Sequence, residues 1–173
     1  MNNSNITSGG NDILINEDNF PDPCFREWLL EQDFVQNGII AKEQIAEITE
    51  INVSCKKIGS LEGIYFFTAL TTLRCDRNKL ARLDISKNTA LRELRCGDNQ
   101  LTSLDVTNNM AFDWLECHNN NIKGTNMDAL ISSLPNTDGK IYIYDSISET
   151  EGNVCTETQV AAIREKGWTP YYL

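Results

Sequence analysis

A repeat of 21 residues constrains this chain more than any other feature, because each copy must fold in the same way. The segment at 70–90 (LTTLRCDRNKLARLDISKNTA) aligns without a gap to 91–111 (LRELRCGDNQLTSLDVTNNMA), and 112–124 begins a third copy. A fixed period of this length is typical of a solenoid, in which each unit packs only against its neighbours. The recurring residues are Leu73, Leu94 and Leu115; Cys75, Cys96 and Cys117; and Asn78, Asn99 and Asn120.

A divergent copy comes first, at a spacing of 22 residues, where Ile51 and Val53 match Leu73 and Cys75. The pattern LxxLxC/LxxNxL resembles the leucine-rich-repeat family, directly over 48–124. With its caps, the chain is similar to the small surface-associated leucine-rich-repeat proteins of gut bacteria. The resemblance implies an α/β fold, a short solenoid with a parallel concave sheet, an N-terminal helical cap and a C-terminal α/β cap. It also implies an extracellular or cell-surface location, with or without a lipid anchor.

The length of 173 residues fits one domain. We expect that domain to cover 17–173. The start, MNNSNITSGGND, has neither a basic region nor an apolar run, so it is not a signal peptide as written. The expected stretches are a polar tether at 1–16, the N-terminal helical cap at 17–47, the leucine-rich repeats at 48–132 and the C-terminal cap at 133–173.

The formal charge of −10 excludes nucleic acid as a favourable partner, because the summed field repels phosphate. No apolar stretch approaches the roughly 18 residues that a membrane-spanning helix needs. His118 is the only histidine and no CxxC pair occurs, so we expect no metal and no cofactor. Glu116 and His118 can share a strand face, but no nucleophile accompanies them, and we expect no enzyme activity.

Alternation along the strands separates an inner layer from an outer one. Leu94 and Cys96 point inward, and Glu93 and Arg95 point outward. The recurring cysteines are therefore predicted to be small buried residues, with a redox or metal role as the lesser alternative. The recurring asparagines are predicted to satisfy backbone groups where the chain bends. Three cysteines lie outside the column, and a Cys24–Cys55 bridge is an open alternative in a secreted protein; these three are Cys24, Cys55 and Cys155.

The N-terminal cap is predicted from FPDPCFREWLLEQ, where Phe25, Trp28 and Leu29 share one helical face. The next segment, 31–49, looks like a helix–loop–helix with a damaged calcium loop. If Asp33 is position one, Val35 and Gln44 stand where oxygen ligands are required. We therefore expect a structural remnant that binds no calcium.

The C-terminal cap is predicted to contain a helix at 127–135, a strand at 139–145, a helix at 156–167 and an edge strand at 168–173. Pro170 has no N–H to donate, so it protects that edge from further pairing. In the strand at 139–145, Ile141 and Ile143 are expected to point inward. Tyr142 and Tyr144 are expected to point outward.

The outward residues form four columns across the sheet. Arg74 and Arg95 are neighbours in one column, either neutralised by nearby carboxylates or available to an anionic partner. The columns are Glu50, Thr72, Glu93, Trp114; Asn52, Arg74, Arg95, Glu116, Tyr142; Ser54, Asp76, Gly97, His118, Tyr144; and Cys55, Arg77, Asp98, Asn119.

Trp114, Tyr142 and Tyr144 are expected to form an aromatic patch beside the arginines, unless the C-terminal cap covers them. The sequence thus favours a monomeric binding module that recognises a protein on the concave sheet. A carbohydrate-binding surface protein that uses exposed Trp and Tyr is the alternative, and a structural or adhesive spacer is another. The candidate partner-binding residues are Arg74, Asp76, Glu93, Arg95, Trp114, Glu116, His118, Tyr142 and Tyr144.

Overall fold

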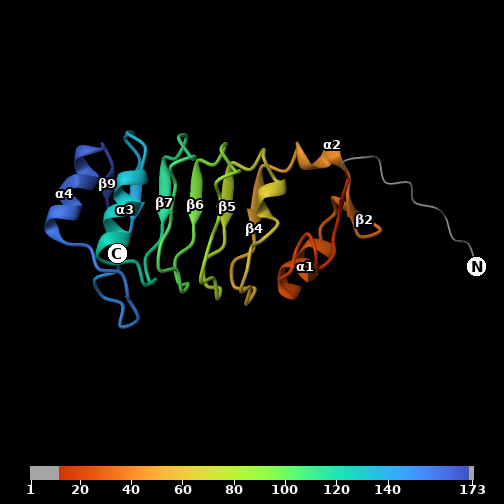
Figure 1. Cartoon of the computed structure of the whole chain (residues 1–173), viewed down its shortest axis with the longest axis horizontal. Coiled ribbons are helices and arrows are strands. Elements are labelled where there is room, and N and C mark those ends of the chain that lie inside the picture. Colours follow the sequence, from red (N-terminus) through yellow and green to blue (C-terminus); the bar gives the residue numbers. More distant parts are fainter. Residues whose placement is uncertain (1–11, 172–173) are drawn as a thin grey trace, which may run out of the picture.

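The repeats form a short α/β solenoid in the computed structural model, which describes residues 12–171. Six short strands line up in sequence order as one parallel sheet (Figure 1). The sequence predicted this arrangement, because each repeat supplies one strand and the C-terminal cap was expected to add two more. The strands are β4 (Glu50–Asn52), β5 (Thr72–Arg74), β6 (Glu93–Arg95), β7 (Trp114–Glu116), β8 (Lys140–Tyr142) and β9 (Thr169–Pro170).

The inner layer follows the predicted register. The recurring leucines and cysteines are fully buried in one continuous core, so the thiol column is an interior layer. Burial raises the pKa of the Cys96 and Cys117 thiols, as it does for Cys75. All six cysteines, which lie within 12–171, are free thiols. The alternative of a Cys24–Cys55 bridge is therefore not realised.

The recurring asparagines connect each repeat to the previous one. Asn99 donates from Nδ2 to the carbonyls of Cys75 and Cys96 at 3.0 and 3.1 Å, and its Oδ1 accepts the Leu80 N–H at 3.0 Å. Asn120 repeats the pattern one turn later. These side chains satisfy backbone groups that the buried bend would leave unpaired, as predicted.

A second buried asparagine pair was not predicted. Asn88 donates to the carbonyls of Ile64 and Phe67, both at 2.9 Å, and Asn109 donates to those of Ile85 and Asn88 at 3.2 and 2.8 Å. Each of the two asparagines is fully buried. The opposite bend of the solenoid therefore shares only the donor side of the first arrangement, because Oδ1 of Asn88 and Oδ1 of Asn109 accept no hydrogen bond from the described residues.

The N-terminal cap begins with α1 (Pro23–Leu30), whose Phe25 and Leu29 are buried against the first repeat. Asp22 caps this helix through the Phe25 N–H, and its Oδ2 accepts the Gly59 N–H of the repeat at 2.8 Å. This one carboxylate thus starts the helix and joins it to the solenoid.

The expected helix–loop–helix over 31–49 is wrong. A hairpin of β2 (Val35–Gln36) and β3 (Ile39–Ile40) occupies it, followed by the short α2 (Lys42–Ile45). Asn37 and Gly38 both have positive φ, which is the two-residue hairpin turn that Asn-Gly favours. β1 (Ile13–Leu14), within the expected tether at 1–16, pairs with β3. Residues 1–11 of that tether lie outside the described residues.

The C-terminal cap contains α3 (Thr125–Ser133) and α4 (Glu157–Glu165), close to the predicted ranges. Thr156 and Gln159 form a capping box at the start of α4, and Pro170 lies in the edge strand β9. A single-turn 3-10 helix, η1 (Ile64–Phe66), completes the elements. In residues 12–171 no helix is long and apolar enough to cross a membrane.

Candidate functional site

The outward residues of β4–β9 form one surface, here called the strand face. Residue pairing confirms the first two predicted columns, since Glu93 lies opposite Thr72 and Trp114, and Arg95 lies opposite Arg74 and Glu116. The second column reaches Tyr142, as predicted, and the structure adds Lys140 and Thr169 from the cap to the first column.

The charged half of the strand face comprises Glu50, Arg74, Glu93 and Arg95. Arg74 pairs with Glu50 at 3.6 Å and with Glu93 at 3.3 Å. Arg95 pairs with the same Glu93 at 2.6 Å and with Glu116 at 3.6 Å. The two neighbouring arginines are therefore neutralised by carboxylates on the same face. The carboxylate of Asp76 accepts a hydrogen bond from the Ser54 hydroxyl at 2.7 Å instead of pairing with either arginine.

The aromatic half comprises Trp114, His118, Tyr142 and Tyr171. Ring centroids are 6.0 Å apart for Trp114 and Tyr171, 5.4 Å for Tyr171 and Tyr142, and 4.0 Å for Tyr142 and His118. The four rings thus form one continuous run across the strand face. Trp114 is half-buried, in a setting typical of binding hot spots.

Tyr142 does not form part of an exposed patch, as the sequence had suggested. It is only 2% exposed, because Tyr171 from the end of the cap packs over it. Burial, followed by the nearby Asp145 carboxylate, raises the pKa of Tyr142 to about 12. Tyr144, the other predicted tyrosine, is half-buried against the core. The cap therefore covers part of the aromatic patch and leaves Trp114 and Tyr171 accessible.

Trp114 is held in place on several sides. Its indole Nε1 donates to Glu116 Oε1 at 2.7 Å. The Arg95 guanidinium and the Lys140 ammonium lie 5.6 and 5.7 Å from the ring centroid. They come from β6 and β8, the strands on either side of β7, so each contributes a cation–π contact. The indole is thus fixed before any partner arrives.

His118 takes no part in a base–carboxylate pair with Glu116. Its Nε2 lies 3.7 Å from Asp98 Oδ2, and its ring lies over Gly97, where a Cβ atom added to the glycine would meet it at 2.5 Å. Gly97 is therefore needed as the floor beneath the imidazole. Within residues 12–171 no three His, Cys, Asp or Glu side chains are grouped so as to hold a metal ion.

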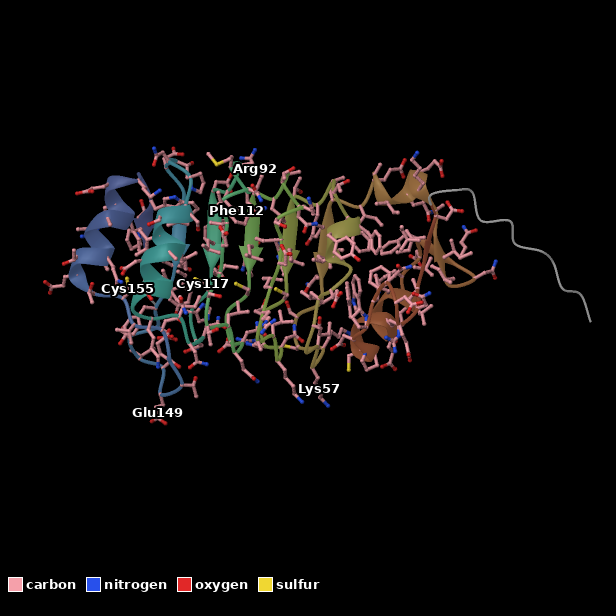
Figure 2. All side chains as sticks on the ribbon, viewed as in Figure 1. Lys57, Arg92, Phe112, Cys117, Glu149 and Cys155 are labelled. Carbon is pink, nitrogen blue, oxygen red and sulfur yellow. The ribbon has the colours of Figure 1, made fainter. Side chains whose placement is uncertain are left out.

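An insertion at 146–152 was not predicted. It interrupts the fourth turn, and Glu149 lies at its outer end (Figure 2). Glu151 ties the insertion down by accepting the N–H groups of Asn119 and Asp145 at 2.9 and 2.7 Å. Asn153 then continues the asparagine column, donating to the Cys117 carbonyl at 2.8 Å.

Comparison with known proteins finds similar solved structures but no matching family model. No protein-family model matches the chain, and no protein of curated function matches it. Among solved structures, the functional domain of InlJ from Listeria monocytogenes is 33% identical over 66% of this chain, with a TM-score of 0.59. This chain resembles the leucine-rich-repeat family. The InlJ domain is described as including a cysteine ladder.

A second neighbour, the internalin InlF from the same organism, is 19% identical over 89% of this chain, with a TM-score of 0.65. The chain spans 26% of the InlJ structure and 43% of the InlF structure. Over the aligned parts it shares the leucine-rich-repeat solenoid fold with both. Its three fully buried cysteines, Cys75, Cys96 and Cys117, lie on successive repeats.

Proposed function

We propose that this chain is a non-catalytic binding module that recognises another protein on the strand face. The observation that supports this most strongly is the prearranged Trp114, fixed by Glu116, Arg95 and Lys140. Tryptophan, tyrosine and arginine are the residues that dominate protein interfaces, and a side chain already immobilised loses less entropy on binding. The internalin-like repeats agree with this proposal, which includes an extracellular or cell-surface location.

A protein partner fits Trp114 better than a sugar does. Stacking on a sugar requires an open aromatic face, but cations from both neighbouring strands lie over this ring. A protein can instead contact the part of the half-buried indole that remains accessible, together with Tyr171 and the charged groups around it. The proposed contact residues are Arg74, Asp76, Glu93, Arg95, Trp114, Glu116, His118 and Tyr144, with Tyr142 as their support.

The test starts from crosslinking of the chain to surface proteins and identification of the crosslinked species by mass spectrometry. The identified protein is then purified and titrated by calorimetry. Trp114→Ala is expected to weaken its binding by about 2 kcal/mol or more, a factor of roughly 30. Met110→Ala is the matched control, since Met110 is 68% exposed in a turn away from β4–β9.

Retention of full affinity by both Trp114→Ala and Arg95→Glu would overturn the proposal. Loss of affinity through Met110→Ala alone would move the interface to another surface. Each variant must first be shown by circular dichroism and thermal melting to be folded like the unchanged chain. Lost binding can then be assigned to the strand face.

A further inference from the structure

The cations on and beside the strand face differ in whether the chain itself neutralises them. The arginines there each pair with at least one carboxylate, and they are Arg74, Arg77, Arg92 and Arg95. Lys140, at the start of β8, is exposed, and no carboxylate of residues 12–171 lies within 4.0 Å of its Nζ. The charge of Lys140 is therefore left for a partner.

The carboxylates of the same surface, in contrast, have partners within the chain. Glu50, Glu93 and Glu116 pair with arginines. Asp76 and Asp98 accept hydrogen bonds from neighbouring side chains at 2.7 and 2.9 Å. A basic partner would have to compete for these groups, whereas an acidic partner would meet an ammonium group that has no competing carboxylate.

Lys140 borders the aromatic residues on which the proposed function depends. It lies directly opposite Trp114 in the sheet, and its Nζ is 5.7 Å from the centroid of the Trp114 ring. Tyr171 is 36% exposed, and its ring centroid is 6.0 Å from that of Trp114. The cation thus stands at the margin of an accessible apolar surface made by two rings.

A hydroxyl group lies on the other side of Lys140. β9 pairs with β8 so that Thr169 lies opposite Lys140, and Thr169 is exposed. Neighbouring strands of a sheet are about 4.8 Å apart, so the hydroxyl and the ammonium are close enough to bind the same group. Both can donate hydrogen bonds, which suits an acceptor such as a carboxylate.

We propose that the protein recognised on the strand face presents an acidic side chain to Lys140, beside an apolar side chain that packs on Trp114 and Tyr171. This inference rests on the proposed function and adds to it the chemistry of the partner. Lys140 is then the residue that selects an acidic segment over a basic or neutral one.

The overall charge of the chain does not prevent this contact. The formal charge of −10 repels an acidic partner at long range. At physiological ionic strength, however, charges separated by more than about 8 Å are largely screened. The pairing at Lys140 acts at hydrogen-bond distance, so it determines which segment stays bound rather than how fast the partner approaches.

A random peptide library displayed on phage provides the probe. The intact chain is the target, at physiological ionic strength, and only peptides that Trp114→Ala binds more weakly are analysed further. We expect these peptides to carry Asp or Glu close to a large apolar residue. A parallel selection on Lys140→Glu should enrich Lys or Arg at that place instead.

The decisive measurement is a double-mutant cycle on one such peptide. Replacing its acidic residue by the matching amide should weaken binding to the intact chain by about two- to fivefold, the range of an exposed ion pair. The same replacement should change nothing on Lys140→Met, which keeps the length of the side chain without its charge. Lys140→Arg should restore the preference for the acid. Lys123→Met is the matched control, since Lys123 is exposed just before α3.

Three outcomes overturn the inference and leave the proposed function standing. One is enrichment of peptides that depend on Trp114 but carry no acidic residue. Another is a preference for basic peptides on the intact chain. The third is an equal loss from the amide replacement on the intact chain and on Lys140→Met. Peptides that all bind Trp114→Ala as well as the intact chain would overturn the proposed function and this inference together.

Discussion

The charged half and the aromatic half of the strand face share one sheet and one register, but they hold their side chains in different ways. In the charged half, Arg74 and Arg95 share Glu93 and stay about a third exposed. In the aromatic half, ring packing has buried Tyr142 almost completely. The same scaffold thus carries one region held by charge and another held by packing.

This difference predicts how each half contributes to the stability of the fold and to the binding of a partner. Exposed ion pairs contribute little to stability, since water and salt screen them and long side chains lose entropy. A buried ring removes apolar surface from water and is tightly constrained. We therefore expect the aromatic half to provide both stability and a rigid binding surface, and the charged half to select among partners.

The largest effect is expected from Tyr142→Ala. Removing a buried ring packed between His118 and Tyr171 should lower the free energy of unfolding by about 3–5 kcal/mol. Arg74→Ala should lower it by less than about 1 kcal/mol. Urea denaturation of both variants measures the difference, with Tyr142→Phe as the conservative control. Equal losses in the two halves would break the comparison.

Gly97→Ala tests the boundary between the halves. The added methyl group would meet the His118 ring at 2.5 Å and push it from Tyr142. We expect a loss of about 1–3 kcal/mol in unfolding free energy, as for other overpacked sites. In a His118→Ala background the same change should cost much less. A cycle with no coupling between the two positions would show that His118 is not supported by this contact.

Glu93→Gln tests the charged half directly. It removes the carboxylate that both arginines share and leaves two like charges side by side. Because all three side chains are partly exposed, the unfolding free energy should fall by no more than about 1 kcal/mol. Added salt should reduce the difference from the unchanged chain. A loss that persists at high salt would indicate packing rather than charge.

The smallest difference between the two halves is expected in the reactivity of the buried thiols that lie beneath them. Cys96 and Cys117 are both fully buried, so both should react with Ellman's reagent only on global unfolding, while the exposed Cys55 reacts at once. Mass spectrometry of the labelled peptides separates the three. Faster labelling of Cys117 than of Cys96 would show that the halves open independently.

The same thiols give stability a pH dependence. Burial raises their pKa, so the folded chain keeps them protonated while the unfolded chain ionises above about pH 8.5. Their contribution is fully present below that pH and is lost as the pH rises further. Cys96→Ala should make the alkaline loss of stability shallower, as measured by melting temperature against pH.

Much of the scaffold could be predicted because its determinants are local. Alternation within a strand places Leu94 inward and Arg95 outward, and the period then transfers that register to each copy. The position of Trp114 on the strand face followed from this alone. The packing of Tyr171 on Tyr142 did not, because the edge strand predicted at 168–173 belongs to no repeat whose register would fix the direction of its side chains.

The sequence prediction is wrong where spacing is ambiguous. Asn37–Gly38 fits the spacing of a damaged calcium loop, although Asn-Gly between apolar residues also indicates a hairpin. The insertion at 146–152 conceals the last member of the asparagine column. A signal is present, because Cys155 follows Asn153 at the same distance that Ile122 follows Asn120.

Asn153 has a practical consequence. Because its amide restores the backbone pattern after the insertion, the coil tolerates a change of length at this turn without losing its pitch. The outer end of the insertion, around Glu149 (Figure 2), is therefore a natural place to graft foreign sequence, provided that Glu151 is kept to hold the loop. A tag or an epitope placed there would be displayed on a rigid rod, with the strand face left free.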